Sequence, residues 1–229
     1  DDGIWHQLSV RLEGPAARQL HLVFLHDWIL HGGRLGPSRE PESPASRDGV
    51  ATQVVWWGPA DDAPAVKVLL ALLGAARERV VIATPYFVPD RPVLLALATA
   101  ALRGVRVDVV VPARSDQRVA DAAARAMFEE LIRAGVRIHL HGDGVLHAKC
   151  ISVDDRVAVV GSANGDRRSF YLDEEVMALL YDRDTAVRVR ERQERWMEAA
   201  RPATREDLED RPLWRRTADD LAALASPLL

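Results

Sequence analysis

Four polar side chains that suit phosphate chemistry lie within residues 146–164, whose sequence is LHAKCISVDDRVAVVGSAN. They are the imidazole of His147, the ammonium of Lys149, the hydroxyl of Ser162 and the carboxamide of Asn164. Lysine and asparagine can donate hydrogen bonds to non-bridging phosphoryl oxygens, and an imidazole can attack phosphorus or protonate a leaving oxygen. These residue types therefore indicate a site that binds and transfers a phosphate group.

A β-hairpin is expected to bring the four side chains to one surface. Its strands are predicted at residues 146–153 and 156–162, with the turn at Asp154-Asp155. His147 and Lys149 are two residues apart on a strand, so both leave the same face. A two-residue turn would place Ser162 directly opposite His147, with the carboxamide following two residues later on that face.

The elements around the hairpin alternate between strand and helix patterns. Strands are expected at 53–57, 80–84, 105–111, 136–141 and 175–181, and helices at 63–77, 92–103, 116–134, 184–200 and 214–225. Strand–helix–strand alternation predicts parallel βαβ units, whereas the hairpin needs antiparallel pairing. The fold class is therefore α/β, with a mixed β-sheet flanked by helices on both faces.

Residues 1–34 have the pattern of the end of a preceding unit. A short strand is expected at 9–13 and an apolar-periodic helix at 15–29. Residues 35–50 are rich in Gly, Pro, Ser and charge, which is typical of a linker. The domain that carries the hairpin is then expected to span 51–229.

Composition excludes several classes of protein. With 229 residues, 48% of them hydrophobic and 28% charged, the chain is an ordinary globular protein that can bury a sizeable core. A single cysteine, Cys150, gives no internal disulfide and favours a cytoplasmic setting. No apolar run is long enough to span a membrane. The net charge of -4 argues against nucleic acid as a partner.

A metal site is not expected. His139, His141 and His147 could be grouped as a cluster, but no carboxylate or cysteine completes a convincing ligand set. The first two are therefore interpreted as exposed strand histidines, and neither a metal nor another cofactor is predicted.

The fixed positions of the hairpin resemble the HKD signature of the phospholipase D superfamily. The pattern is His147-Ala-Lys149, then Asp154 after four residues, then Gly161-Ser-Ala-Asn after six. The flanking stretches TPYFVPD at 84–90 and GSANGDRRSFYLDEEV at 161–176 are similar to the second half of bacterial cardiolipin synthases. The opening WHQLSVRLEGPAARQLHLVFLHDW resembles the segment that follows the first HKD motif in those enzymes.

The resemblance implies a metal-free, two-step phosphatidyl transfer through a phosphohistidine. His147 would be the nucleophile or the general acid, while Lys149 and Asn164 would bind phosphoryl oxygens, with Ser162 at the same pocket. A carboxylate after the motif holds a catalytic imidazole in such enzymes, and Glu175 is the best candidate. Two further motif positions, Asp154 and Gly161, are expected to be structural, with Asp154 tying down the turn through its own backbone bonds. Tyr86 and Phe87 are candidates either for contacts with the lipid or for packing of the strand end, and Arg168 either for attracting an anionic headgroup or for a structural ion pair with a residue such as Asp166 or Glu174.

An in-line displacement needs two imidazoles on opposite sides of phosphorus, yet the chain carries one motif. The second is expected from an upstream N-terminal half or from a second copy in a homodimer. The expected partners are phospholipids, phosphatidylglycerol and cardiolipin among them, and a membrane surface. The expected location is the cytoplasmic side of the bacterial inner membrane, with peripheral attachment. Two alternatives stay open, namely a dimeric phospholipase or endonuclease, and a catalytically silent lipid-binding half.

Overall fold

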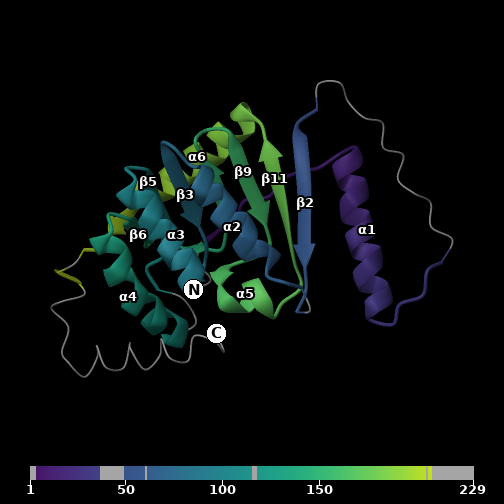
Figure 1. Cartoon of the computed structure of the whole chain (residues 1–229), viewed down its shortest axis with the longest axis horizontal. Helices are drawn as coiled ribbons and strands as arrows, with labels where there is room; N and C mark the ends of the chain where they lie inside the picture. The colour runs from purple at the N-terminus through teal and green to yellow at the C-terminus, as the bar shows by residue number, and fades with distance from the viewer. Residues whose placement is uncertain (1–3, 37–48, 60, 115–117, 205, 208–229) are drawn as a thin grey trace.

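A single eight-stranded sheet forms the centre of the molecule (Figure 1). The computed structural model describes residues 4–36, 49–59, 61–114, 118–204 and 206–207. The strand order is β12-β6-β5-β3-β8-β9-β11-β2. The bounds are β2 Ala51–Trp57, β3 Arg79–Ala83, β5 Arg106–Pro112, β6 Arg137–His141, β8 Cys150–Val153, β9 Val157–Gly161, β11 Glu175–Tyr181 and β12 Ala200–Pro202.

The predicted mixed sheet is confirmed. Strands β3, β5 and β6 run parallel, and every other neighbouring pair in the large sheet is antiparallel. β2 and β3 run in the same direction, as the βαβ pattern predicts, but they are not neighbours in the sheet. β2 lies at the edge of the sheet and pairs with β11, with Trp57 next to Glu175.

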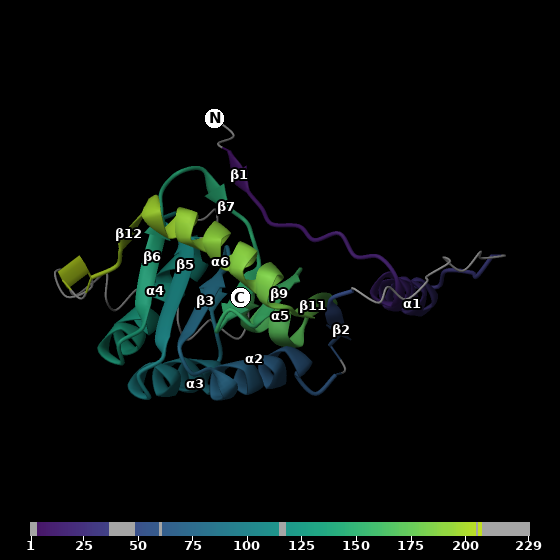
Figure 2. The same cartoon turned by 90° about the horizontal axis from the view of Figure 1, so that it is seen from above.

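Helices cover both faces of the sheet, as predicted (Figure 2). The helices α2 (Pro64–Ala75), α3 (Arg91–Leu102) and α4 (Arg118–Arg133) lie on one face, and α6 (Arg183–Glu198) lies on the other. Side chains alternate along β3, so Val80 and Ile82 join the core under α2 and α3, whereas Val81 and Ala83 join the core under α6. The sheet is thus buried on both faces, which explains its near-continuous apolar strands.

Two short parallel strand pairs lie outside the large sheet. β1 (Trp5–His6) pairs with β7 (Val145–Leu146), and β4 (Phe87–Val88) pairs with β10 (Gly165–Asp166). Each pair ties a distant segment to one end of the HKD-like sequence. The short helix α5 (Arg167–Tyr171) follows directly after β10.

The strand expected at Ser9–Glu13 is wrong. These residues pair with no strand in the described part of the chain. Their alternation has another cause, because Leu8, Val10 and Leu12 pack against the core under α6. The helix that follows, α1 (Pro15–Leu30), forms as predicted.

The predicted register of the hairpin is wrong by one residue. Cys150 pairs with Val160 and Val153 pairs with Val157, so the turn contains three residues rather than two. Asp154 and Asp155 both have positive φ, and the Arg156 amide closes the loop by donating to the Val153 carbonyl at 2.9 Å. Ser162 therefore does not lie opposite His147.

The linker at 35–50 lies mostly, and the tail helix at 214–225 wholly, outside the described residues. Helix α1 lies beside β2, and only its Val23 side chain is buried (Figure 1). Large apolar side chains of this helix face solvent, namely Leu22, Phe24, Trp28, Ile29 and Leu30.

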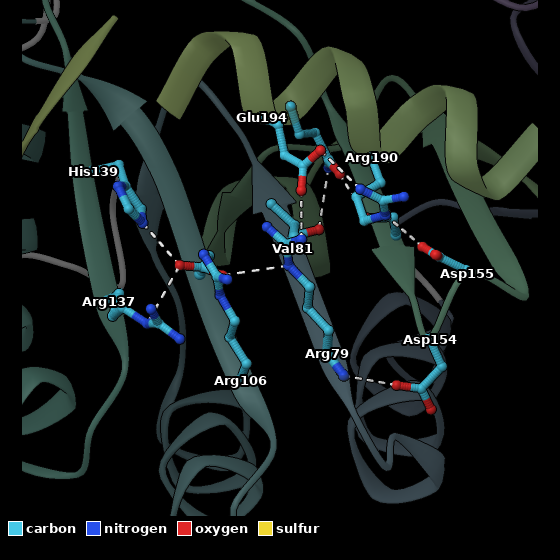
Figure 3. Close-up of polar contacts among 12 residues, drawn as sticks. Arg79, Val81, Arg106, Arg137, His139, Asp154, Asp155, Arg190 and Glu194 are labelled. Carbon is cyan, nitrogen blue, oxygen red and sulfur yellow. Dashed lines mark hydrogen bonds and ion pairs between the residues drawn. The ribbon is translucent and has the colours of Figure 1, made fainter. Parts of the chain in front are cut away.

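A polar network lies on the face of the sheet that α6 covers (Figure 3). Its centre is Asp108 on β5, whose side chain is fully buried and lies 2.7 Å from Arg106 Nε and 2.9 Å from His139 Nε2. Burial by itself would raise the pKa of the Asp108 carboxyl, but the hydrogen bonds from His139 and Arg106 outweigh it and lower the pKa. A second ion pair, from Arg79 to Glu194 at 2.6 Å, ties β3 to α6.

The turn of the hairpin is held by the Asp154 carboxylate. It accepts backbone N–H bonds from Arg77, Glu78 and Arg79, each at 2.8 Å. The bonds therefore reach the start of β3 rather than closing the turn itself. Burial opposes the charge, but the three N–H bonds outweigh it and hold the pKa of Asp154 below its usual value.

Replacing Asp154 by Asn should destabilise the fold at neutral pH by about 1–2 kcal/mol, because a charged acceptor of three N–H bonds becomes neutral. The pKa of an unfolded Asp is about 3.9, and the folded value is lower, so the stabilisation is present above about pH 4 and is lost as the pH falls through the folded pKa. Urea unfolding at pH 7 and pH 3 measures this. The difference between wild type and Asp154→Asn should shrink at pH 3.

The matched control is Asp62→Asn, because Asp62 is exposed and bonds Lys67 at the surface. It should change stability little. An Asp154→Asn loss that is equal at both pH values would show that the charge is not the cause.

Candidate active site

His147 and Lys149 lie between β7 and β8, just before the start of β8 in the middle of the large sheet, and we call this end of the central strands the reaction edge. The His147 amide donates to the His6 carbonyl at 2.9 Å, and the Gly161 amide donates to the Lys149 carbonyl at 3.3 Å. The alternate residues Leu146, Ala148 and Cys150 are buried in the core under α6. His147 and Lys149 therefore leave the opposite face, where both are half-buried.

The predicted pairing of imidazole and ammonium is present in the geometry. Lys149 Nζ lies 3.2 Å from His147 Nδ1 and donates to the His147 carbonyl at 3.0 Å. Burial lowers the pKa of Lys149, while the negative charges of Glu175 and Asp166 oppose that shift. A partly desolvated ammonium interacts more strongly with an anion than one in bulk water.

Trp5 packs beside the His147 imidazole, with ring centroids 5.0 Å apart and planes tilted by 55°. The β1–β7 pair positions it, because His6 pairs with Leu146, the residue before His147. The N-terminal segment is thus part of the site. Sequence reasoning missed Trp5, and its only signal was the resemblance of the opening residues to a segment that follows an HKD motif.

Ser162 and Glu175 bond each other beside the ammonium. The Ser162 hydroxyl donates to the Glu175 carboxylate and accepts from the Val176 amide at 3.0 Å. Although the register differs from the prediction, both side chains remain at the reaction edge, because the end of β9 runs beside the start of β11. At Gly161 a Cβ would lie 2.3 Å from the Val176 carbonyl oxygen, so this close approach requires glycine.

Asn164 presents a buried polar atom to the site. The backbone N–H of Asn164 donates to the Ser169 hydroxyl at 3.0 Å. Its Oδ1 is buried and has no hydrogen-bond partner within the described residues. An unpaired buried polar atom is costly. Rotation of the carboxamide can place its NH₂ at the same position, where it can donate to a phosphoryl oxygen.

The segment Thr84–Val88 holds the Asn164 loop in place. The Gly165 amide donates to Thr84 Oγ1 at 2.9 Å and to the Tyr86 carbonyl at 3.1 Å. Phe87 pairs with Gly165, and a Cβ added at Gly165 would lie 3.0 Å from the Phe87 ring. This places the backbone of Tyr86 and Phe87 next to the reaction edge. Thr84 was not predicted as a positioning residue.

Arg168 is exposed and bonds Asp173, with its Nε 3.1 Å from both carboxylate oxygens.

Asp166 caps α5 by accepting a hydrogen bond from the Ser169 amide at 2.8 Å, and burial is the main cause of its raised pKa. Sequence reasoning also missed Asp166 as a buried acidic residue close to Lys149. Its sequence signal is the Asp three residues before Ser169, which is typical of a helix N-cap.

The interpretation of His139 and His141 as exposed strand histidines is wrong. His141 is 2% exposed and its Nδ1 bonds the Trp196 carbonyl, while His139 bonds Asp108. Each ring makes one hydrogen bond in the packing under α6. Among the described residues, no cluster of three or more His, Cys, Asp or Glu side chains is arranged to hold a metal ion.

The cavity beneath the site is too small for a substrate. Lys149, Cys150 and Asn164 border an apolar cavity of about 40 Å³ under the reaction edge, which is room for little more than a water molecule. Burial raises the pKa of the Cys150 thiol to about 12, so this cysteine is not a nucleophile. A phosphate ester must therefore approach from the solvent-accessible side of the site, the outer face, where half-buried His147 and exposed Ser162 lie.

Comparisons with known proteins identify the family of the chain. The family model described as "Cardiolipin synthase, PLD-like domain" matches residues 69–197. A cardiolipin synthase of Geobacillus sp. is 37% identical over 99% of this chain and 46% of its own length. Cardiolipin synthase A of Pseudomonas putida is 38% identical over 98% of this chain and 47% of its own length. The chain thus spans about half the length of these curated relatives.

Two solved structures have the same fold. Phosphatidylserine synthase of Haemophilus influenzae matches with a TM-score of 0.63 at 19% identity, over 97% of this chain and 57% of that one. Nuc of Salmonella typhimurium, described as a phospholipase D family member, matches with a TM-score of 0.59 at 19% identity, over 68% of this chain and 99% of that one.

Replacing Lys149 by Gln should weaken the binding of a phosphate-like anion at least tenfold, because a charge-assisted hydrogen bond worth about 1.5–3 kcal/mol is lost. Titration of the chain with tungstate by isothermal calorimetry measures this. Lys67→Gln is the matched control, since Lys67 is the other lysine and bonds Asp62 at the surface. Equal affinities for wild type and Lys149→Gln would remove Lys149 from the anion site.

Proposed function

The chain belongs to the family of cardiolipin synthase phospholipase D-like domains, and from this premise we propose that it is the C-terminal catalytic half of a phosphatidyltransferase. The proposed reaction moves a phosphatidyl group to an alcohol acceptor such as phosphatidylglycerol. The observation that carries the proposal is the half-buried Lys149 ammonium, 3.2 Å from His147 Nδ1, within the residues 69–197 that the family model matches.

In the first step one imidazole nitrogen attacks the donor phosphorus. A nitrogen–phosphorus bond forms, the phosphorus–oxygen bond to the alcohol breaks, and a second imidazole gives its proton to the leaving oxygen. In the second step that imidazole removes the proton of the acceptor hydroxyl. The acceptor oxygen then attacks phosphorus, and the nitrogen–phosphorus bond breaks.

His147 serves as one of these two imidazoles, as nucleophile or as acid. Lys149 and Asn164 hold the phosphoryl oxygens and stabilise the charge that shifts between them in the transition state. Ser162 links the phosphate pocket to Glu175. Glu175 serves as the orienting carboxylate for a catalytic imidazole, either His147 or its partner.

The second imidazole comes from an N-terminal HKD half or from a second copy of the chain. We assign residues 1–34 to the end of the preceding half, 35–50 to a linker and 51–229 to the catalytic domain. The exposed apolar side chains of α1, such as Phe24 and Trp28, support this division. A helix that packs against the sheet of another unit has apolar side chains that are exposed when that unit is absent.

The proposed substrates are phosphatidylglycerol and other phospholipids, met at the cytoplasmic surface of the inner membrane by peripheral attachment. Within the described residues, no helix combines the length and the apolar character needed to cross a bilayer. Tyr86 and Arg168 are the proposed lipid contacts, whereas the Phe87 side chain is 3% exposed and packs in the core. With a net charge of -4, the chain is not expected to use nucleic acid.

Incubation with labelled phosphatidylglycerol in micelles should yield cardiolipin and glycerol, identified by mass spectrometry. His147→Ala should abolish product while leaving the melting temperature unchanged, because the imidazole is half-buried at the reaction edge. Phosphatidic acid alone would identify a hydrolase. Cardiolipin from the isolated chain would show that two copies complete the site, and product only after an upstream half is added would assign the second histidine to that half.

Incubation with EDTA should leave the turnover unchanged, since the proposed steps use only imidazoles, an ammonium and a carboxamide. The readout is the rate of cardiolipin formation before and after dialysis against the chelator. Activity that is lost in EDTA and restored by zinc would contradict the proposed mechanism.

A further inference from the structure

The short strand β1 brings an indole ring to the imidazole of His147. β1 lies beside β7, with Trp5 next to Val145 (Figure 2). The Val145 amide donates to the Ile4 carbonyl at 2.8 Å. The His147 amide donates to the His6 carbonyl at 2.9 Å, so the backbone of the histidine is itself part of this pairing. The mechanism above gives the indole no role.

Side chains also fix β1 to the domain. The His6 ring meets the His141 ring edge-on, with centroids 4.9 Å apart and planes at 88°. His141 is in turn 2% exposed, and its Nδ1 lies 3.0 Å from the Trp196 carbonyl of α6. The residues that follow β1 pack against the core under α6. The position of Trp5 is therefore set by the folded domain.

The close approach of β1 to β7 requires glycine at position 144. Gly144 precedes β7 and has a φ of +69°, which already favours glycine. A Cβ there would overlap the Ile4 carbonyl oxygen and lie 3.3 Å from His6 Nε2. A larger residue would push β1 away from β7, and Trp5 would then lose its contact with His147.

The ammonium of Lys149 does not by itself set the orientation of the imidazole. Its Nζ lies 3.2 Å from His147 Nδ1 and 3.4 Å from His147 Nε2, so it does not select one of the two nitrogens. In the proposed mechanism this ammonium also binds a phosphoryl oxygen. The contact with Trp5, with ring centroids 5.0 Å apart, does not use the ammonium and can persist through both steps.

We propose that Trp5 is a positioning residue, which holds the His147 ring in the orientation that both steps of the transfer need. The inference rests on the proposed function, because it concerns the imidazole of that reaction. Reacting groups must be held within about 0.5 Å of the productive geometry by packing and hydrogen bonds. Trp5 acts through His147 rather than on the phospholipid, so its loss changes kcat and leaves KM unchanged.

Kinetics in the natural protein that contains this chain test this role. Trp5→Ala should lower kcat for cardiolipin formation about tenfold or more, because a reacting nitrogen is displaced. The KM for phosphatidylglycerol and the ratio of cardiolipin to phosphatidic acid should not change. The melting temperature should match wild type, since Trp5 is 55% exposed. Trp5→Phe should recover most of the rate, because it restores an aromatic ring beside the imidazole.

Trp56→Ala is the matched control for loss of an indole, since Trp56 is 47% exposed and lies on β2. It should match wild type. A Trp5→Ala variant that keeps the wild-type kcat, or that raises KM at constant kcat, would overturn the positioning role and leave the proposed function intact. A wild-type protein that forms neither cardiolipin nor phosphatidic acid would overturn both.

Gly144→Ala removes the same contact while keeping Trp5 and His147. It should lower kcat as Trp5→Ala does, and the two changes together should lower it no further. Gly104→Ala is the matched control, because Gly104 also has a positive φ, +90°, but nothing lies within 4 Å of an added Cβ. It should keep the wild-type kcat. A Gly144→Ala variant with the wild-type kcat would contradict the inference.

Nuclear magnetic resonance reports the contact without any activity. In the 229-residue chain labelled at histidine Cε1, the His147 signal is the one of seven that His147→Ala removes. The ring current of the indole should shift this signal, so Trp5→Ala and Gly144→Ala should both move it. Trp56→Ala and Gly104→Ala should leave it in place. A His147 signal that Trp5→Ala does not move would overturn the contact, whatever the kinetics show.

Discussion

A partly desolvated ammonium beside an imidazole is the interaction on which the rest of the site depends. Lys149 is half-buried, and its ammonium donates to the backbone carbonyl of His147. The segments around it have backbone partners of their own, since β1 pairs with β7, the Thr84–Val88 segment bonds Gly165, and the start of β11 pairs with the end of β9. The ammonium is thereby left facing the outer surface, with Glu175 and Asp166 near enough to favour its charge.

Local patterns predicted most of the fold, since apolar periodicity and turn residues report nearby structure. The strand Glu175–Tyr181 matches its predicted bounds, and helices α1 to α6 other than the short α5 were expected within a few residues. The errors share a physical origin. The place of β2 in the sheet and the hairpin register both depend on contacts between distant segments, such as the bonds of Asp154 to the start of β3.

The site likewise has a part that follows from local spacing and a part that depends on contacts between distant segments. Spacing along the chain was enough to group His147 with Lys149, because two residues apart on an extended backbone means one face. Ser162 lies at this edge for a reason that differs from the expected one, since it bonds the backbone of β11 rather than facing His147 across a two-residue turn. Trp5 reaches the site through the β1–β7 pair, a tertiary contact that a single sequence does not encode as a pattern.

Transfer to an alcohol, rather than to water, demands more than the motif supplies. Ser162 is exposed, and the cavity beneath the site holds about 40 Å³, so the chain by itself leaves the outer face open to solvent. A phosphohistidine on that face would meet water as readily as a lipid hydroxyl. In the proposed mechanism, the surface that supplies the second histidine must therefore also exclude water, and the exposed apolar side chains of α1 are available to pack against such a surface. Under the proposed function, selectivity for an acceptor would then arise from the assembled enzyme, with the motif supplying the chemistry and the neighbouring surfaces deciding which hydroxyl reaches the phosphorus.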